Sequence, residues 1–168
     1  MFFFLKLQIG VILKHPESEL VRKSFTFRRM DLPPQVFLTK KSLLRWLCLS
    51  LGLMSENESR STVVEILDAF FFFVFSKKEK PSSQQIKAFL EKNRGISVSE
   101  KLVRYHLNRL CDLGFVVHEK GFYSLNPAPD AERDDLPAAF RHWYRREIED
   151  STQIMEKALA KVQAAYEK

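Results

Sequence analysis

Cysteine and glycine are scarce in this sequence, and the few that occur lie apart. Cys48 and Cys111 are the two cysteines, with no Cys-x-x-Cys pair and no histidine at ligand spacing beside them. A structural zinc site is therefore not expected, and a reducing environment is favoured. The five glycines form no phosphate-cradling loop. The serines, carboxylates and histidines form no recognisable catalytic constellation, so neither an enzyme nor a bound cofactor is expected.

A long apolar run is also missing. Residues 1–14 are largely apolar, but Lys6 and Gln8 interrupt them. A membrane span needs about 20 consecutive apolar residues, and a secretory signal carries its positive charges before the apolar run. Neither pattern is present, so no membrane partner is expected. We interpret residues 1–14 as a strand or short helix packed on the domain, or as a disordered tail. A biological start at Met30 is a further interpretation, because the composition changes there.

The charge of the chain is positive but unevenly distributed. An apolar fraction of 45% with 29% charged residues is typical of a folded soluble protein. The net charge of +6 and the pI near 9.4 suit a nucleic-acid binder. Residues 1–29 contain six basic and two acidic residues, a net +4, which leaves +2 for the rest of the chain. The domain after residue 29 is therefore nearly neutral.

Residues 95–125 change their hydrophobic period partway. One apolar stripe has the spacing of a helix: Val103, Leu107, Leu110 and Gly114. Ser97 or Ser99 can cap the start of this helix, and Gly114 can take the left-handed conformation at its end. Residues 115–118 and 122–125 have the composition of strands, and the turn between them contains a glycine. The pattern predicts a helix followed by a β-hairpin.

The opposite face of this predicted helix is polar and basic. Its members are spaced at i, i+3, i+4 and i+7: Lys101, Arg104, Tyr105 and Asn108. Ammonium, guanidinium, phenol and amide groups donate hydrogen bonds to phosphates and to base edges. This face indicates contact with DNA. A merely solvated helix face is the alternative interpretation, because short motifs of this kind discriminate weakly.

The run Val103-Arg-Tyr-His-Leu-Asn-Arg-Leu-Cys-Asp-Leu-Gly-Phe-Val resembles the recognition helix and first wing strand of winged helix-turn-helix transcription regulators of archaea and bacteria, of the ArsR-, MarR- or PadR-like kind. The resemblance covers roughly residues 60–126 and assigns no subfamily. It implies a buried apolar stripe and a major-groove role for Arg104, Tyr105 and Asn108. It also places Lys120 at the tip of the wing, where the turn holds one lysine and no arginine.

Two further helices are predicted on the N-terminal side of the helix-turn-helix. Residues 39–54, capped by Thr39, are apolar on more than one side, which favours core support, a dimer surface or both. Residues 62–76, capped by Ser61 or Thr62, contain four consecutive phenylalanines that could equally form a strand. A helix is preferred because the residues just before them are strong helix formers. The phenylalanines are expected in the core rather than in a ligand pocket.

The next predicted helix extends to about Asn93 and is capped by Ser82 or Ser83. Residues 93–97 form the tight turn of the helix-turn-helix, with Gly95 at positive φ. Arg94 is expected to meet phosphate, ahead of the lysines at 77, 78 and 80, because the turn adjoins the recognition helix. His106 is expected to be hydrogen-bonded and partly buried.

The prolines at 127 and 129 separate this unit from a C-terminal helix that begins at Asp134 or Asp135. Two series on the apolar side of this helix repeat every seven residues: Ile148, Met155 and Val162, and Thr152, Leu159 and Tyr166. The helix is expected to pack against a second copy of the chain or against the helix near Trp46. Dimerisation suits winged-helix regulators, which commonly bind paired half-sites.

The sequence therefore predicts a mainly α fold with a small β-hairpin wing. Its parts are an N-terminal tail or arm (1–38), an accessory helix (39–54), a winged helix-turn-helix domain (60–126) and a C-terminal dimerisation helix (133–168). The expected function is sequence-specific regulation of transcription by a cytoplasmic, nucleoid-associated homodimer that binds double-stranded DNA. The candidate DNA-binding residues are Lys101, Arg104, Tyr105, Asn108, Arg94, Ser99 and Lys120. The alternative is a winged-helix module that binds protein or RNA.

Overall fold

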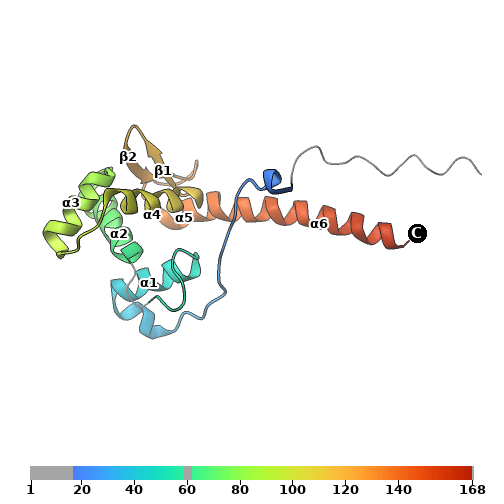
Figure 1. The fold of residues 1–168 in the computed structure, drawn as a ribbon, viewed down its shortest axis with the longest axis horizontal. Helices are drawn as coiled ribbons and strands as arrows, with labels where there is room; N and C mark the ends of the chain where they lie inside the picture. Colours follow the sequence, from blue (N-terminus) through green and yellow to red (C-terminus); the bar gives the residue numbers. More distant parts are fainter. Residues whose placement is uncertain (1–16, 59–61, 168) are drawn as a thin grey trace, which may run out of the picture.

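The computed structural model describes residues 17–58 and 62–167 of the chain. They form a mainly helical fold with one two-stranded antiparallel sheet, as the sequence predicted (Figure 1). The predictions for residues 1–14 and for a cap at Ser61 lie outside the described residues. Within the described ranges, no helix combines the length and apolarity that a membrane crossing requires.

Three helices enclose the centre of the core: α2 (Thr62–Phe71), α3 (Ser83–Arg94) and α4 (Glu100–Asp112). Phe70 of α2, Ile86 of α3 and Leu107 of α4 are fully buried. The phenylalanine run is helical, as preferred, but it widens into a π-helical stretch, η3 (Phe72–Lys77). There the rings of Phe72 and Phe89 stack at 4.9 Å between centroids. The phenylalanine run therefore packs the end of α2 against α3.

Local capping sets the ends of the two later helices. The Ser82 side chain accepts from the backbone N–H of Gln85, and the Gln85 side chain accepts from the backbone N–H of Ser82. This reciprocal capping box starts α3. Gly95 ends α3 with φ of 64°, the positive φ that the sequence predicted for it. Ser99, rather than Ser97, then caps α4 by accepting from Leu102.

The hairpin consists of β1 (Val116–Glu119) and β2 (Phe122–Leu125), in register with His118 opposite Tyr123. It was predicted almost to the residue. A further contact was not predicted: Ser82 forms an isolated antiparallel bridge with Phe122, and the Tyr123 N–H donates to the Pro81 carbonyl at 2.8 Å. The segment between α2 and α3 therefore holds the hairpin against the helices.

The helix α1 (Lys40–Ser50) packs on α2 and ends four residues before the predicted limit. The chain reaches it through two 3₁₀ turns, η1 (Glu17–Leu20) and η2 (Pro34–Leu38). Two arginines donate hydrogen bonds to carbonyl groups at and just beyond the C-terminal end of α1. Arg28 donates to Leu49 O at 2.6 Å, and Arg109 donates to Leu53 O at 2.7 Å. Cations suit this end of a helix because its last carbonyls lack partners.

The C-terminal region is helical without a break: α5 (Leu136–Phe140), a π-helical stretch η4 (Arg141–Arg145) and α6 (Arg146–Tyr166). Asp135 caps its start, as predicted. The Phe140 ring packs on Phe115, and the Tyr144 ring packs on Phe25, so this end belongs to the domain. The rest of α6 projects away from the body (Figure 1).

Of the two partners expected for the C-terminal helix, the helix near Trp46 does not contact its exposed part within one chain, and the second copy stays a prediction. Every residue from Thr152 to Glu167 is exposed. The Trp46 indole instead donates to Asp31 O in the N-terminal arm at 2.8 Å. The reason is that α5 is anchored beside β1, which directs the helix axis away from α1 (Figure 1).

Candidate nucleic-acid interface

The outward face of α4 has the composition that the sequence predicted. Its apolar stripe is buried, with Val103 and Leu107 fully inaccessible to solvent. Lys101, Arg104 and Asn108 are exposed, and Tyr105 retains 55% of its surface. One side of the helix therefore supports the core, and the other presents two cations, a phenol and an amide to solvent. These groups match phosphates and base edges chemically.

Glu100 orients the cationic part of this face. Its Oε1 accepts from the Ser83 hydroxyl at 3.0 Å and lies 3.8 Å from Arg104 Nη1. The carboxylate thus connects the first turn of α3 to the arginine one turn along α4. The spacing of Glu100 and Arg104 at i and i+4 could have revealed this pair in the sequence. The hydrogen bond from Ser83 could not be predicted from sequence spacing, because it depends on how α3 packs on α4.

Asn108 connects the α4 face to the hairpin. Its Oδ1 accepts from the Tyr123 hydroxyl at 3.3 Å. Burial raises the pKa of Tyr123 above its ordinary value, so this hydroxyl remains a proton donor. The bond leaves the Asn108 amide NH₂ group free to donate outward. Tyr123 was not among the predicted site residues, because its role requires the packing of β2 against α4.

Arg94 is placed differently from the four residues on α4. Its Nη2 lies 2.7 Å from Asp68 Oδ2, and the Lys40 ammonium lies 2.7 Å from the other oxygen of that carboxylate. The Asp68 side chain is only 10% exposed, whereas that of Arg94 is 39% exposed. The guanidinium therefore neutralises a nearly buried charge on α2. A phosphate would have to compete with that carboxylate for it.

The remaining predicted residues lie at the ends of elements. Ser99 uses its Oγ to cap α4, accepting from Leu102 N at 3.2 Å. Lys120 occupies the hairpin tip with φ of 50°, followed by Gly121 with φ of 87°. Lys120 and its neighbour Glu119 are both exposed. The tip consequently offers one cation beside one carboxylate.

His106 does not have the hydrogen bond that the sequence predicted. It is half-buried, but its Nδ1 is inaccessible to solvent and has no hydrogen-bond partner among the described residues. Burial, followed by the nearby Arg109 charge, lowers the pKa of His106. Arg109 turns toward the loop after α1, where it donates to the carbonyl oxygens of Gly52 and Leu53. His106 is therefore a core residue rather than part of the polar face.

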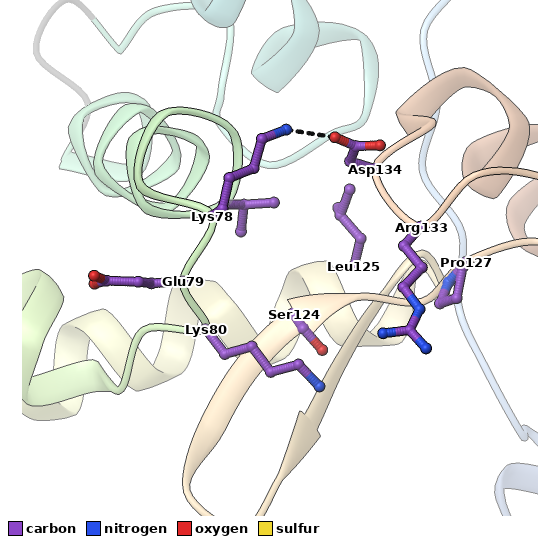
Figure 2. Close-up of a pocket in the computed structure, with 9 residues that line it drawn as sticks. Lys78, Glu79, Lys80, Ser124, Leu125, Pro127, Arg133 and Asp134 are labelled. Carbon is purple, nitrogen blue, oxygen red and sulfur yellow. Dashed lines mark hydrogen bonds and ion pairs between the residues drawn. The ribbon is translucent and has the colours of Figure 1, made fainter.

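A cavity of about 670 Å³ lies on another side of the hairpin (Figure 2). Lys80, Ser124 and Arg133 extend toward a common space in it, while Lys78 pairs with Asp134 at its other end. That pair lowers the pKa of Asp134 through the lysine's hydrogen bond and charge. No residue of α4 lines this cavity. It is thus separate from the polar face described above.

Among the described residues, no group of three or more His, Cys, Asp or Glu side chains is arranged to hold a metal ion. Comparison with protein-family models, with curated proteins and with solved structures found no match to this chain. The assignment of a function therefore depends on the α4 face and on the elements that hold it.

Proposed function

We propose that this protein is a sequence-specific, DNA-binding regulator of transcription that inserts α4 into the major groove. The observation that carries the proposal is the pairing of a fully buried stripe on α4 with an exposed face of Lys101, Arg104, Tyr105 and Asn108. A B-form major groove admits one α-helix and presents hydrogen-bonding groups to it. The regulator acts as a cytoplasmic, nucleoid-associated homodimer.

The order of elements supports a winged helix-turn-helix. The helix α2 is followed by the bridging residue Ser82, then by α3, the Gly95 turn, α4 and the hairpin. In such a unit the second helix of the turn enters the groove while the first crosses the backbone. The bridge from Ser82 to Phe122 fixes the hairpin relative to the start of α3, and the bond from Tyr123 to Asn108 fixes it relative to α4.

The side chains of the face have distinct roles in this proposal. Arg104 donates to a guanine edge, and Asn108 to an adenine edge, because their donor geometries match those bases. Lys101 and Lys120 contact phosphates and set the register of the protein on the duplex. Glu100 holds the Arg104 side chain near the groove and repels phosphates from the start of α4. Arg94 contributes mainly to folding, through Asp68.

The test is selection of bound duplexes from a randomised library, followed by sequencing. We expect an enriched motif with two-fold symmetry, because a dimer binds two half-sites. Replacing Arg104 or Asn108 by alanine should relax the preference at one base pair per half-site by about 1–3 kcal/mol. The matched control is Arg141→Ala, which removes an exposed cation at the start of η4.

The selection also separates the two functional classes. No enrichment by the folded, dimeric protein would contradict sequence-specific recognition and favour a protein-interaction or RNA-interaction module. Enrichment that persists unchanged in both Arg104→Ala and Asn108→Ala would place DNA recognition on a surface other than α4.

A further inference from the structure

The helix α6 carries a largely apolar stripe, and from Thr152 onward the stripe is exposed in the described chain. Its members are spaced by four, three, four, three and four residues: Ile148, Thr152, Met155, Leu159, Val162 and Tyr166. Ile148 packs on the domain core, whereas Met155 is 57% exposed, Leu159 66% and Val162 54%. This is the spacing of a helix seam that packs knobs into holes of another helix. A soluble helix with such a stripe buries it against something.

We infer that the stripe packs against the α6 stripe of a second copy, with the two helices antiparallel. The inference specifies the geometry of the proposed homodimer and does not depend on DNA binding. An antiparallel pair with its two-fold axis at Lys157 places Met155 opposite the partner's Leu159. The same axis places Thr152 opposite the partner's Val162 and Ile148 opposite the partner's Tyr166. Every member of the stripe thereby meets another member, as an isologous interface requires.

One flank of the stripe favours the same axis. Small residues occur every seven positions on one flank: Ser151, Ala158 and Ala165. In an antiparallel pair this flank meets itself, so Ala158 lies beside the partner's Ala158 and Ser151 lies beside the partner's Ala165. The backbones can then approach closely on that side. In a parallel pair the small flank would instead meet the opposite flank, which carries Glu149, Glu156 and Gln163.

The charge along α6 also favours the antiparallel arrangement. Residues 146–156 contain one basic and four acidic residues, a net −3, and residues 157–166 contain two lysines and no acid, a net +2. Antiparallel packing places the negative half of each helix beside the positive half of the other. Parallel packing would place like charges together, which is unfavourable across a helix pair. A second copy of this chain is therefore the partner that fits the stripe.

The arrangement has a consequence for the proposed DNA-binding unit. Tyr144 is buried in the domain and lies 13 residues before the axis. At about 1.5 Å per residue, the two Tyr144 residues lie roughly 40 Å apart along the helix pair. Half-sites one helical turn apart are separated by about 34–36 Å. The two domains are therefore joined to the helix pair at points whose separation is of the same order as one turn of the duplex.

The oligomeric state is tested first, by sedimentation equilibrium of the full chain without DNA. We expect a dimer whose dissociation constant rises about 100-fold or more in Leu159→Glu, because two leucines leave the seam and two carboxylates enter it. The matched control is Ile154→Glu: Ile154 is 67% exposed on the same helix but lies off the stripe, so its dimer should persist. A monomeric unmodified protein, or equal loss in both variants, would overturn the inference.

The orientation is tested by single cysteine substitutions and a short bismaleimide crosslinker. Ala158→Cys should crosslink with itself in the antiparallel pair. Ser151→Cys and Ala165→Cys should each fail to crosslink alone and should crosslink when the two proteins are mixed. If each of these variants crosslinks with itself and not with the other, the helices are parallel and the inference is wrong.

The unmodified chain is the control, because Cys48 is buried and Cys111 is half-buried. The dimer should also persist in Arg104→Ala, so failure of dimerisation and failure of DNA binding give different results.

Discussion

Arg104 and Arg109 lie on the same helix, and the structure places them in different surroundings. Arg104 is exposed on the polar face of α4, and its closest acidic partner, Glu100, lies 3.8 Å away. The half-buried Arg109 donates to Leu53 O at 2.7 Å and to Gly52 O at 2.6 Å. We predict that Arg109→Met lowers the free energy of unfolding without changing DNA binding by the folded protein. Arg104→Met should do the reverse.

The size of the stability loss follows from the two hydrogen bonds of Arg109. A hydrogen bond to a charged group contributes about 1.5–3 kcal/mol when it is buried. Two such bonds would give about 3–6 kcal/mol, which we reduce to about 2–4 kcal/mol because solvent reaches part of Arg109. Methionine keeps the apolar stem of the side chain, so little packing is lost. Arg104→Met should cost less than about 0.5 kcal/mol, as exposed helix ion pairs do.

The assay is urea denaturation followed by circular dichroism, paired with DNA binding measured across a salt series. Arg109→Met should unfold at a clearly lower urea concentration and keep the salt dependence of the unmodified protein. Arg104→Met should unfold normally and show a shallower salt dependence. Equal urea midpoints for Arg109→Met and the unmodified protein would refute the assignment of Arg109 to the junction between α4 and the loop after α1.

Three further predictions concern buried polar groups. Asp68→Ala should lower the free energy of unfolding by about 1–2 kcal/mol in urea, because both of its cationic partners are partly exposed. Burial lowers the pKa of His106, so the unfolded chain binds this proton more tightly and stability is lost as pH falls below the ordinary histidine pKa of about 6.5. In thermal melts between about pH 7 and pH 5, His106→Gln should reduce this loss of stability with falling pH. A loss that is unchanged in His106→Gln but removed in His118→Gln would refute the assignment to His106. Burial raises the pKa of Cys48 to about 12 and that of Cys111 to about 11, so a thiol reagent near neutral pH should label both slowly until urea unfolds the protein; rapid labelling of the folded protein would contradict this.

The features that could be predicted from the sequence are those that depend on neighbouring residues. The stripe from Val103 to Leu110, the positive φ of Gly95 and the hairpin after Gly114 each follow from spacing or composition over a few positions. The exposed face of α4 follows in turn, since a helix with one buried side exposes the other. These predictions are confirmed.

The features that could not be predicted depend on contacts between distant segments. The bridge from Ser82 to Phe122 joins residues 40 positions apart, and Arg109 donates to a carbonyl 56 residues away. Arg94 was expected at phosphate because of its place beside the turn, yet its guanidinium meets Asp68 of α2. Local pattern carries no information on which of several arginines a buried carboxylate or carbonyl will attract.

The central claim is that the α4 face binds double-stranded DNA, and fluorescence anisotropy with a labelled random-sequence duplex tests it most directly. Lys101, Arg104 and Lys120 provide three exposed cations per protomer and six per dimer, so the logarithm of the dimer's affinity should fall with that of salt with a slope of about −5.4. Arg104→Ala removes two of these cations from the dimer and should make the slope shallower by about 1.8.

The basic N-terminal arm is the matched control for this measurement. Truncation at Met30 would remove packing by Phe25 and Arg28, so the exposed Arg22 and Arg29 are replaced by glutamine instead. The account predicts that this double variant keeps most of the binding and that Arg104→Ala loses affinity at every salt concentration. Binding that is lost with the arm charges and retained in Arg104→Ala, or no binding by any folded dimer at low salt, would contradict the account.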